Sequence, residues 1–330
     1  MALTQSAFHQ LRLVCRSFAE ALVAPWTSRC LLLQESFPVV ALPSLLTWIS
    51  RYGDSVQSLT AHGGSDVLPS VLVALKFTSY RLLTASLAQA TFLQVGLLSE
   101  HSSLTAIDLK LVSITDLQCL QGLPSLRTLC LEGEVFSGLS KLPHLTHLRV
   151  TRANAICSQD CAFVSCLRKL LLNHAVLAAF TTQGISVCHA LRELSINESC
   201  VEAEDVADHL NLRSDTEPRI PPGMAALSSL TSLQLSLRGN VDHFNLQWLS
   251  GLTSLRVLGL LTRRHVEVTP HLTALTGLIK LGISADSLEG DAAVQIKLRV
   301  DWAAMKSLQF LQIGPGHVAL DVCSLLGLCH

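Results

Sequence analysis

Aromatic and charged residues are scarce in this sequence of 330 residues. Phe, Trp and Tyr make up 5% of it, and Asp, Glu, Lys and Arg make up 15%, whereas soluble domains contain about 25% charged residues. The hydrophobic share is 49% and the mean hydropathy is +0.43. Long apolar runs are nevertheless missing, because no stretch approaches the roughly 18 uninterrupted apolar residues that a membrane-spanning helix requires. We therefore expect a soluble protein without a membrane partner.

An excess of charge of one sign is also lacking. The formal net charge is −1, which provides no basic face to neutralise phosphates and disfavours a nucleic-acid partner. The first residues lack the basic start, apolar run and small-residue cleavage site of a secretory signal. Without such a signal, the odd number of 11 cysteines indicates reduced thiols. We therefore expect a cytoplasmic or nuclear location, with the cytoskeleton or a ciliary axoneme as the alternative.

The sequence does contain one recurrent phrase, with leucine or another apolar residue at positions 1, 4 and 6. The clear copies begin at Leu104, Leu126, Leu145, Leu167, Leu191, Leu230, Leu255, Leu278 and Leu308, and weaker copies begin at Val56 and Leu72. Most clear copies begin 19 to 25 residues apart, near the roughly 20–29 residues of leucine-rich repeats. Apolar positions 4 and 6 predict a short strand in which alternate residues are buried.

A second regularity precedes many phrases, where apolar residues recur at every third position. Leu117, Leu120 and Leu123 form one such run, and Leu246, Leu249 and Leu252 form another. This period is typical of short helical or 3₁₀ turns with one apolar edge. Neither the strand nor the turn can bury its apolar edge alone, so stacked neighbours would share one core beneath a parallel sheet.

The phrase and its spacing resemble the leucine-rich-repeat family over roughly residues 54 to 318. The resemblance implies an α/β solenoid of about 11 repeats, with a curved parallel sheet and short helices or turns on its convex side. We expect two domains, a helical segment over residues 1–36 and the repeat array over residues 37–330. Within the array we expect a helix over residues 43–52, an inserted loop near 201–223, an extra strand over 294–302 and a C-terminal cap near 318–330. The loop is acidic, and it is either solvated or a docking element.

The N-terminal segment carries a second resemblance. Phe8, Leu11, Cys15, Phe18 and Leu22 follow the spacing of an amphipathic helix. The sequences "LRLVCRSFAEAL" (11–22) and "APWTSRCLLL" (24–33) are similar to the second half of an F-box. The resemblance implies an F-box/leucine-rich-repeat protein whose F-box is incomplete, with Leu11, Val14, Cys15 and Phe18 as the residues that contact a Skp-type adaptor of a cullin ubiquitin ligase. The other interpretation is that this segment caps the open core of the first repeat.

Catalytic motifs are absent, so we expect no enzymatic activity and no cofactor. His144 and His147 would not share a face, and Cys157, Cys161 and Cys166 lack the spacing of zinc modules. The cysteines are better explained as small core residues. We therefore expect no metal site.

Positions 3, 5 and 7 of the phrase would point away from the core, onto the concave face of the sheet. They place six polar side chains on three adjacent strands: His147, Arg149, Lys169, Asn173, Glu193 and Asn197. Further along, the same positions give the apolar residues Val257, Leu261 and Phe310. A polar patch beside an exposed apolar one indicates a protein-binding surface.

Two functional classes follow. The first is a non-catalytic substrate receptor of an SCF ubiquitin ligase, in which the concave face selects a protein substrate. The second is a structural or scaffolding leucine-rich-repeat protein, cytoskeletal or axonemal, without an adaptor.

Overall fold

The computed structural model describes most of the repeat array. The described residues are 29–33, 39–62, 66–78, 81–110, 117–133, 135–136, 138–151, 155–156, 165–173, 188–197, 224–237, 247–262, 266–268, 270–285, 295–298, 300–314 and 317–320. The chain forms two compact units, residues 1–129 and residues 130–330. The domain boundary expected at residue 36 lies outside the described residues and stays a prediction.

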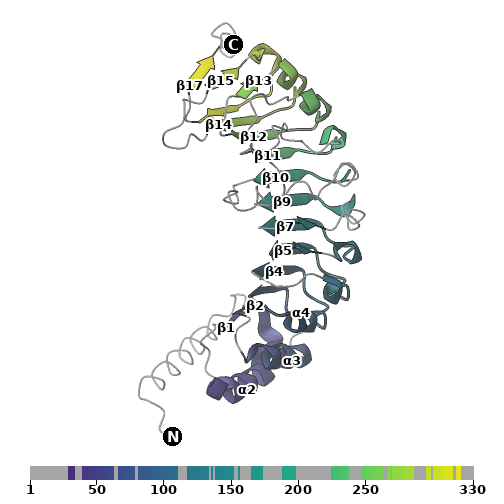
Figure 1. Cartoon of the computed structure of the whole chain (residues 1–330). Helices are drawn as coiled ribbons and strands as arrows, with labels where there is room; N and C mark the ends of the chain where they lie inside the picture. The colour runs from purple at the N-terminus through teal and green to yellow at the C-terminus, as the bar shows by residue number, and fades with distance from the viewer. Residues whose placement is uncertain are drawn as a thin grey trace, which may run out of the picture. The chain divides into compact units, whose positions relative to one another are not determined.

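The first unit pairs short parallel strands in chain order and covers them with α-helices. Its strands are β1 (Arg29–Leu33), β2 (Val56–His62), β3 (Thr84–Ala88) and β4 (Ala106–Lys110), each parallel to the next. Its helices are α2 (Leu42–Tyr52), α3 (Leu68–Thr78) and α4 (Phe92–Leu98), with 3₁₀ turns η1 (Val39–Ala41), η2 (Gly53–Ser55) and η3 (Leu117–Leu120) (Figure 1). β5 (Thr128–Glu132) contains the boundary between the units.

Two expectations for the first unit have different outcomes. The helix expected over residues 43–52 is confirmed as α2, which ends at Tyr52 and has Gly53 as its C-cap residue. The weak repeat phrase at Leu72 was wrong, because this segment belongs to α3. Leu68, Val71, Leu72 and Leu75 are buried at the i, i+3, i+4, i+7 spacing of one helix face. The strand of this repeat lies further along, at β3.

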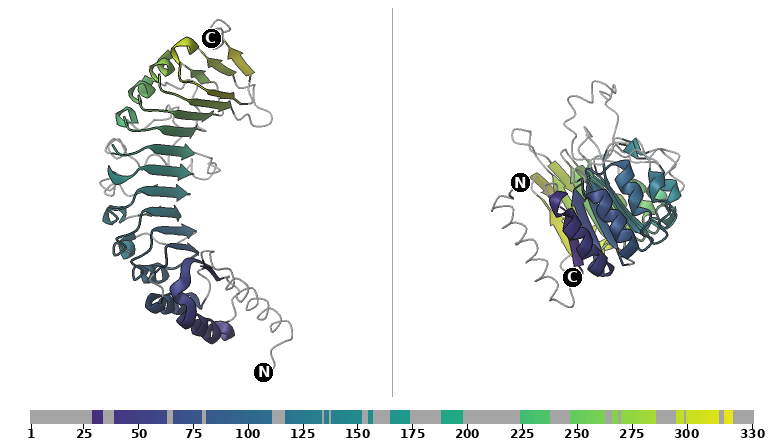
Figure 2. Two further views of the ribbon diagram at one scale, coloured as in Figure 1. Left: turned by 180° about the vertical axis from the view of Figure 1, so that it is seen from behind. Right: turned by 90° about the horizontal axis from the view of Figure 1, so that it is seen from below.

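The second unit repeats one strand and one 3₁₀ turn. Its main strands are β7 (His147–Thr151), β9 (Lys169–Asn173), β10 (Glu193–Asn197), β11 (Ser232–Leu237), β12 (Val257–Thr262), β14 (Lys280–Ala285) and β16 (Phe310–Ile313). Each is parallel to the next and in register with it. The 3₁₀ turns η4 (Leu139–Lys141), η7 (Met224–Ala226), η8 (Gln247–Gly251), η9 (Pro270–Ala274) and η10 (Trp302–Ala304) lie at the other side of the repeats (Figure 2).

Shorter strands pair outside the main sheet. β6 (Val135–Phe136) pairs with β8 (Ala155–Ile156), and β15 (Gln295–Leu298) lies between β13 (Val266–Val268) and β17 (His317–Leu320). The extra strand expected over residues 294–302 is present in part as β15, whereas Trp302 begins the 3₁₀ turn η10. β17 covers the first residues of the C-terminal cap expected at 318–330, and the remainder lies outside the described residues.

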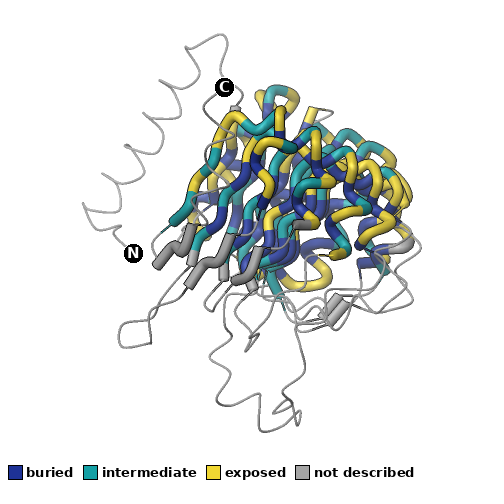
Figure 3. Tube along the Cα trace, turned by 90° about the horizontal axis from the view of Figure 1, so that it is seen from above, coloured by how far each residue is buried: buried dark blue, intermediate teal, exposed yellow. Residues whose placement is uncertain are grey.

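The buried core consists of the side chains at fixed positions of the repeat phrase. Positions 1, 4 and 6 are buried in nearly every repeat, as in Leu145, Leu148 and Val150. Buried positions alternate with less buried ones along the strands (Figure 3). The last repeat differs, since Leu308, Leu311 and Ile313 are only partly buried. β16 is at the end of the described main sheet, so its side chains have a neighbouring described strand on one side only.

The backbone also links successive repeats of the second unit. The carbonyl oxygen at position 2 of one phrase accepts hydrogen bonds from two N–H groups of the next repeat. The Thr146 oxygen, for example, accepts from Arg168 N at 2.8 Å and from Lys169 N at 3.1 Å. The pattern recurs at Arg168, Arg192, Thr231, Arg256 and Ile279. These bonds fix the register of the strands. They also provide hydrogen-bond partners for backbone N–H and C=O groups, which are costly to bury unpaired.

These observations confirm a leucine-rich-repeat α/β solenoid. Of the predicted F-box-like segment over residues 1–36, the structure describes residues 29–33, which form β1 of the main sheet. Among the helices that the structure describes, none combines the length and the apolar character needed to cross a membrane.

Candidate binding face

The face of the main sheet that carries positions 3, 5 and 7 is called the open face here. The registers of the second unit arrange this face in three rows that run across the strands. The position-3 row is His147, Lys169, Glu193, Ser232, Val257, Lys280 and Phe310. The position-5 row is Arg149, Leu171, Ser195, Gln234, Gly259, Gly282 and Gln312. The position-7 row is Thr151, Asn173, Asn197, Ser236, Leu261 and Ser284.

The six predicted polar residues lie together on the first part of the open face. This polar patch consists of His147, Arg149, Lys169, Asn173, Glu193 and Asn197, on β7, β9 and β10. Each is exposed or partly exposed. The Lys169 Nζ lies 2.5 Å from the Glu193 Oε2. The pair is solvated, so it contributes at most about 1 kcal/mol to stability. The pair therefore contributes little to the stability of the fold.

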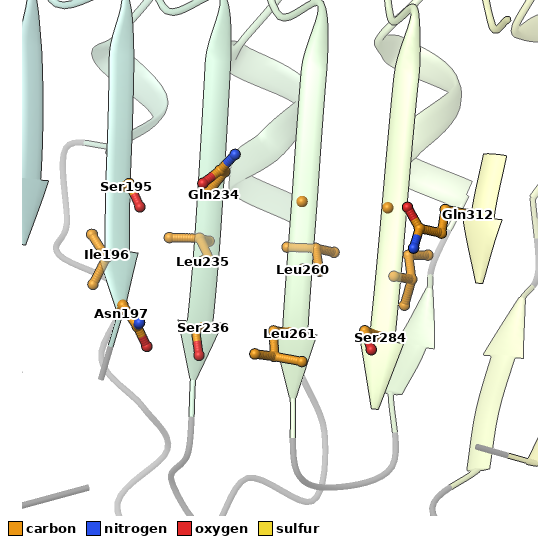
Figure 4. A pocket seen from close by; sticks show the side chains of 13 residues that line it. Ser195, Ile196, Asn197, Gln234, Leu235, Ser236, Leu260, Leu261, Ser284 and Gln312 are labelled. Atoms are coloured by element: carbon orange, nitrogen blue, oxygen red, sulfur yellow. The ribbon is translucent and has the colours of Figure 1, made fainter. Parts of the chain in front are cut away.

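A hollow of about 390 Å³ adjoins the polar patch. Its lining comes from β10, β11, β12, β14 and β16, and it includes Gly259, Gly282 and the side chains of Gln234 and Gln312. The register puts Gln234, Gly259, Gly282 and Gln312 side by side in one row. Two adjacent positions in this row thus lack a side chain. Figure 4 shows Gln234 and Gln312 at two sides of the hollow.

The position-7 row forms the lower rim of the hollow (Figure 4). Asn197, Ser236, Leu261 and Ser284 belong to it. Asn197 is also a member of the polar patch, so the two features are continuous. Ser236 is only 8% exposed, and its Oγ has no hydrogen-bond partner among the described residues.

The position-3 row of the same strands carries apolar and cationic side chains. Val257 is partly buried, whereas Phe310 is 57% exposed. The Lys280 Nζ lies 5.0 Å from the centroid of the Phe310 ring, within the range of a cation–π contact. Of the predicted apolar residues, only Leu261 lines the hollow, whereas Val257 and Phe310 lie in the position-3 row outside its lining.

The remaining candidates are only partly within the described residues. Leu11, Val14, Cys15 and Phe18, predicted to contact an adaptor, lie outside them, as does the acidic loop 201–223. Among the described cysteines, Cys188 is buried and Cys119 and Cys130 are partly buried, whereas Cys30 and Cys166 are exposed, so Cys166 is not the small core residue that the sequence predicted. Within the described ranges, no three His, Cys, Asp or Glu side chains are grouped so that they could hold a metal ion.

The sequence interpretation missed the hollow. The sequence does contain an indication of the hollow, because Gly259 and Gly282 both occupy position 5 of consecutive phrases. Glycine is unusual inside a strand and often marks a close approach by a ligand or another backbone. The buried hydroxyl of Ser236 had no comparable signal, because the phrase places it on the open face.

No protein-family model matches the sequence, and no curated protein sequence matches it significantly. Three of the solved structures to which this chain is similar are the following. An internalin (inlF) from Listeria monocytogenes is 17% identical over 88% of this chain and 92% of its own, with a TM-score of 0.49. An internalin C2 from the same organism is 18% identical over 63% of this chain and 77% of its own, with a TM-score of 0.40. A leucine-rich-repeat protein of Leptospira interrogans is 16% identical over 83% of this chain and 88% of its own, with a TM-score of 0.34.

Proposed function

We propose that this chain is a non-catalytic scaffold that binds a partner protein on its open face. The observation that carries the proposal is the in-register polar patch and its continuity with the hollow. Together they offer charged, amide, hydroxyl and apolar groups on one rigid sheet. Such a mixture suits a protein interface, in which polar groups set specificity and a few apolar anchors supply most of the binding energy.

Charge reversal tests the proposal. The double variant Arg149→Glu/Lys169→Glu inverts the cationic part of the polar patch without touching a buried residue. We expect it to weaken binding of the partner protein that co-purifies with the wild-type chain, first identified by mass spectrometry and then titrated as a purified protein. Charge reversal at an interface acts through lost electrostatic complementarity and slower association.

The matched control reverses two lysines away from the open face. Lys141→Glu/Lys306→Glu changes the net charge equally, and both lysines are exposed near the 3₁₀ turns η4 and η10. We expect this variant to bind the partner as the wild type does. Equal binding by both double variants would contradict a role for the polar patch.

The finer form of the proposal is a substrate receptor of an SCF ubiquitin ligase, located in the cytoplasm or nucleus. It is supported by the F-box resemblance of residues 11–33 and by the scaffold that follows them. Leu11, Val14, Cys15 and Phe18 would contact a Skp-type adaptor. Calorimetric titration of purified adaptor should give a weak, saturable isotherm that Phe18→Ala abolishes. If no heat is measured while the polar patch is still required for the partner, the chain is a scaffold without an adaptor.

A further inference from the structure

Positive charge is concentrated on three neighbouring repeats of the second unit. The described residues 138–151, 165–173 and 188–197, which include β7, β9 and β10, contain several lysine and arginine side chains but a single acidic one, Glu193. On the open face of the described strands β11, β12, β14 and β16, by contrast, Lys280 is the only charged side chain. The formal net charge of the whole chain is −1. The excess of cations is therefore a local property of these repeats.

Four of these cations lie close together, and we call them the basic cluster: Arg149, Arg168, Lys169 and Arg192. Arg168 and Arg192 occupy position 2 of successive phrases, where the strands begin, and the Arg192 N–H donates to the Arg168 carbonyl oxygen at 2.8 Å. Lys169 follows Arg168 as the first residue of β9, and Arg149 lies on β7, the strand paired with β9. Neighbouring strands of a sheet are about 4.8 Å apart, so one ligand segment can contact all four side chains.

Most of the basic cluster lacks a counter-ion. Glu193 pairs with Lys169, its neighbour in register. None of the ion pairs that join described side chains involves Arg149, Arg168 or Arg192, and all three arginines are exposed. Like charges on neighbouring strands repel one another, and exposed side chains contribute nothing to the core. The fold therefore does not require these arginines, and they present uncompensated positive charge to a ligand.

The surroundings of the basic cluster favour a peptide over a nucleic acid. The Glu193 carboxylate lies beside the cations and would repel a phosphate backbone, whereas nucleic-acid sites require a basic surface that neutralises several phosphates. Asn173 and Asn197 are neighbours in the position-7 row. Each of their amides offers a donor and an acceptor, which match the N–H and C=O groups of an extended peptide.

We propose that the open face at β7, β9 and β10 binds an acidic segment of the partner protein, whose aspartate or glutamate side chains pair with the basic cluster. This inference rests on the proposed function and specifies the chemistry of the partner. The Glu193 carboxylate already makes such a contact with Lys169. The partner's carboxylates occupy the equivalent place at the three arginines, because a guanidinium group holds a carboxylate by two parallel hydrogen bonds. Glu193 thus competes with the partner for Lys169.

The test uses a fluorescein-labelled peptide of alternating glutamate and serine as the probe, titrated with the full chain at low ionic strength. We expect a saturable rise in fluorescence anisotropy that weakens as salt is added, because salt screens exposed charges. The same peptide with glutamine in place of glutamate should not bind. A single-stranded oligothymidylate with an equal number of charges should bind more weakly than the acidic peptide.

Two variants with opposite effects locate the binding site. Arg168→Ser/Arg192→Ser should weaken the acidic peptide roughly five- to thirtyfold, the effect of two lost exposed ion pairs. Lys141→Ser/Lys306→Ser is the matched control, because it removes the same charge at the exposed turns and should leave binding unchanged. Glu193→Gln releases Lys169 and should tighten binding about two- to fivefold. Damage to the fold would not produce a gain in affinity.

Four outcomes would overturn the inference. They are equal binding of the acidic and neutral peptides, tighter binding of the oligothymidylate, an equal loss in the two double serine variants, and weaker binding of the acidic peptide by Glu193→Gln. If any of them occurs while Arg149→Glu/Lys169→Glu still loses the partner, the proposed function stands and only the acidic segment is wrong. If the acidic peptide binds as expected but the double reversal leaves partner binding unchanged, the proposed function fails, and the acidic partner segment fails with it.

Discussion

Leu148 on β7 lies directly opposite Leu170 on β9, and their side chains are 1% and 0% exposed. The same pairing continues at position 4 through Leu194, Leu233, Leu258, Leu281 and Leu311. A single file of leucines therefore runs beneath the main sheet of the second unit. Each leucine packs against the equivalent residue of the next repeat, which makes the core cooperative along the array.

An acidic residue in this file should be strongly destabilising. Leu148→Asp removes apolar contacts and buries a carboxylate without a counter-ion, so we expect a loss of several kcal/mol in the free energy of unfolding. The adjacent Arg149→Asp places the same residue on the exposed open face and should cost about 0.5 kcal/mol or less. Thermal melts followed by circular dichroism compare them. Similar melting temperatures for the two variants would show that the strand register is wrong.

Two glycine substitutions should have opposite effects on stability. Gly251→Ala brings a Cβ atom to 2.5 Å from the Ala225 oxygen, so the backbone of η7 or η8 must shift, at a cost of roughly 1–3 kcal/mol. Gly282→Ala meets no close atom and reduces the freedom of the unfolded chain, so it should be neutral or add up to about 1 kcal/mol. Denaturant unfolding of both variants measures the difference. A larger loss for Gly282→Ala would contradict the geometry of the hollow.

A reciprocal pair of hydrogen bonds caps the N-terminus of α4. The Thr91 hydroxyl accepts from the Gln94 N–H at 3.4 Å, and the Gln94 Oε1 accepts from the Thr91 N–H at 2.8 Å. Thr91→Ala should lower the free energy of unfolding by about 1 kcal/mol. Thr91→Ser keeps the hydroxyl and should remain close to the wild type. If Thr91→Ser lost as much stability as Thr91→Ala, the cap would not be the cause.

His101 should make the first unit sensitive to acid. Burial lowers the pKa of His101 below its ordinary value of 6.5, with the Glu100 carboxylate opposing the shift and Lys76 adding to it. The unfolded chain regains the ordinary pKa and therefore binds more protons. The contribution of neutral His101 to the free energy of unfolding is therefore complete above about pH 6.5. This contribution is lost as the pH falls through the lowered pKa. Melting temperatures between pH 7.5 and pH 5 should fall less steeply for His101→Gln. A fall as steep for His101→Gln as for the wild type would show that His101 is not the cause.

The sequence predicted the repeating part of the fold because its period is strict. Leu145, Leu148 and Val150 occupy their expected buried positions, and the 3₁₀ turns follow the period-three runs. The weak phrase at Leu72 misled the interpretation, since its apolar residues satisfy the helical period as well. The partial exposure of Leu311 results from the position of β16 at the end of the described main sheet. The residues around Leu311 in the sequence do not indicate that position.

The sequence predicted the polar patch of the candidate site but not the hollow. The strand period alone assigns a side chain to the open face, so the six residues of the polar patch could be named in advance. A hollow depends on which side chains are small in neighbouring strands, and this follows only once the register aligns Gly259 with Gly282. The missing partner of Ser236 depends on the three-dimensional surroundings of one atom, which a repeat pattern does not specify.

Site-specific photocrosslinking in cells tests the central claim, that the open face binds a partner protein, most directly. Benzoylphenylalanine would replace Arg149 or Glu193 on the open face, and Lys141 or Ser228 at the exposed turns. All four side chains are exposed, so their intrinsic access to other proteins is comparable. We predict one discrete crosslinked species, with the same partner identified by mass spectrometry, from the two open-face positions and none from the two turn positions. Crosslinks to that partner from positions 141 and 228 alone would contradict the account.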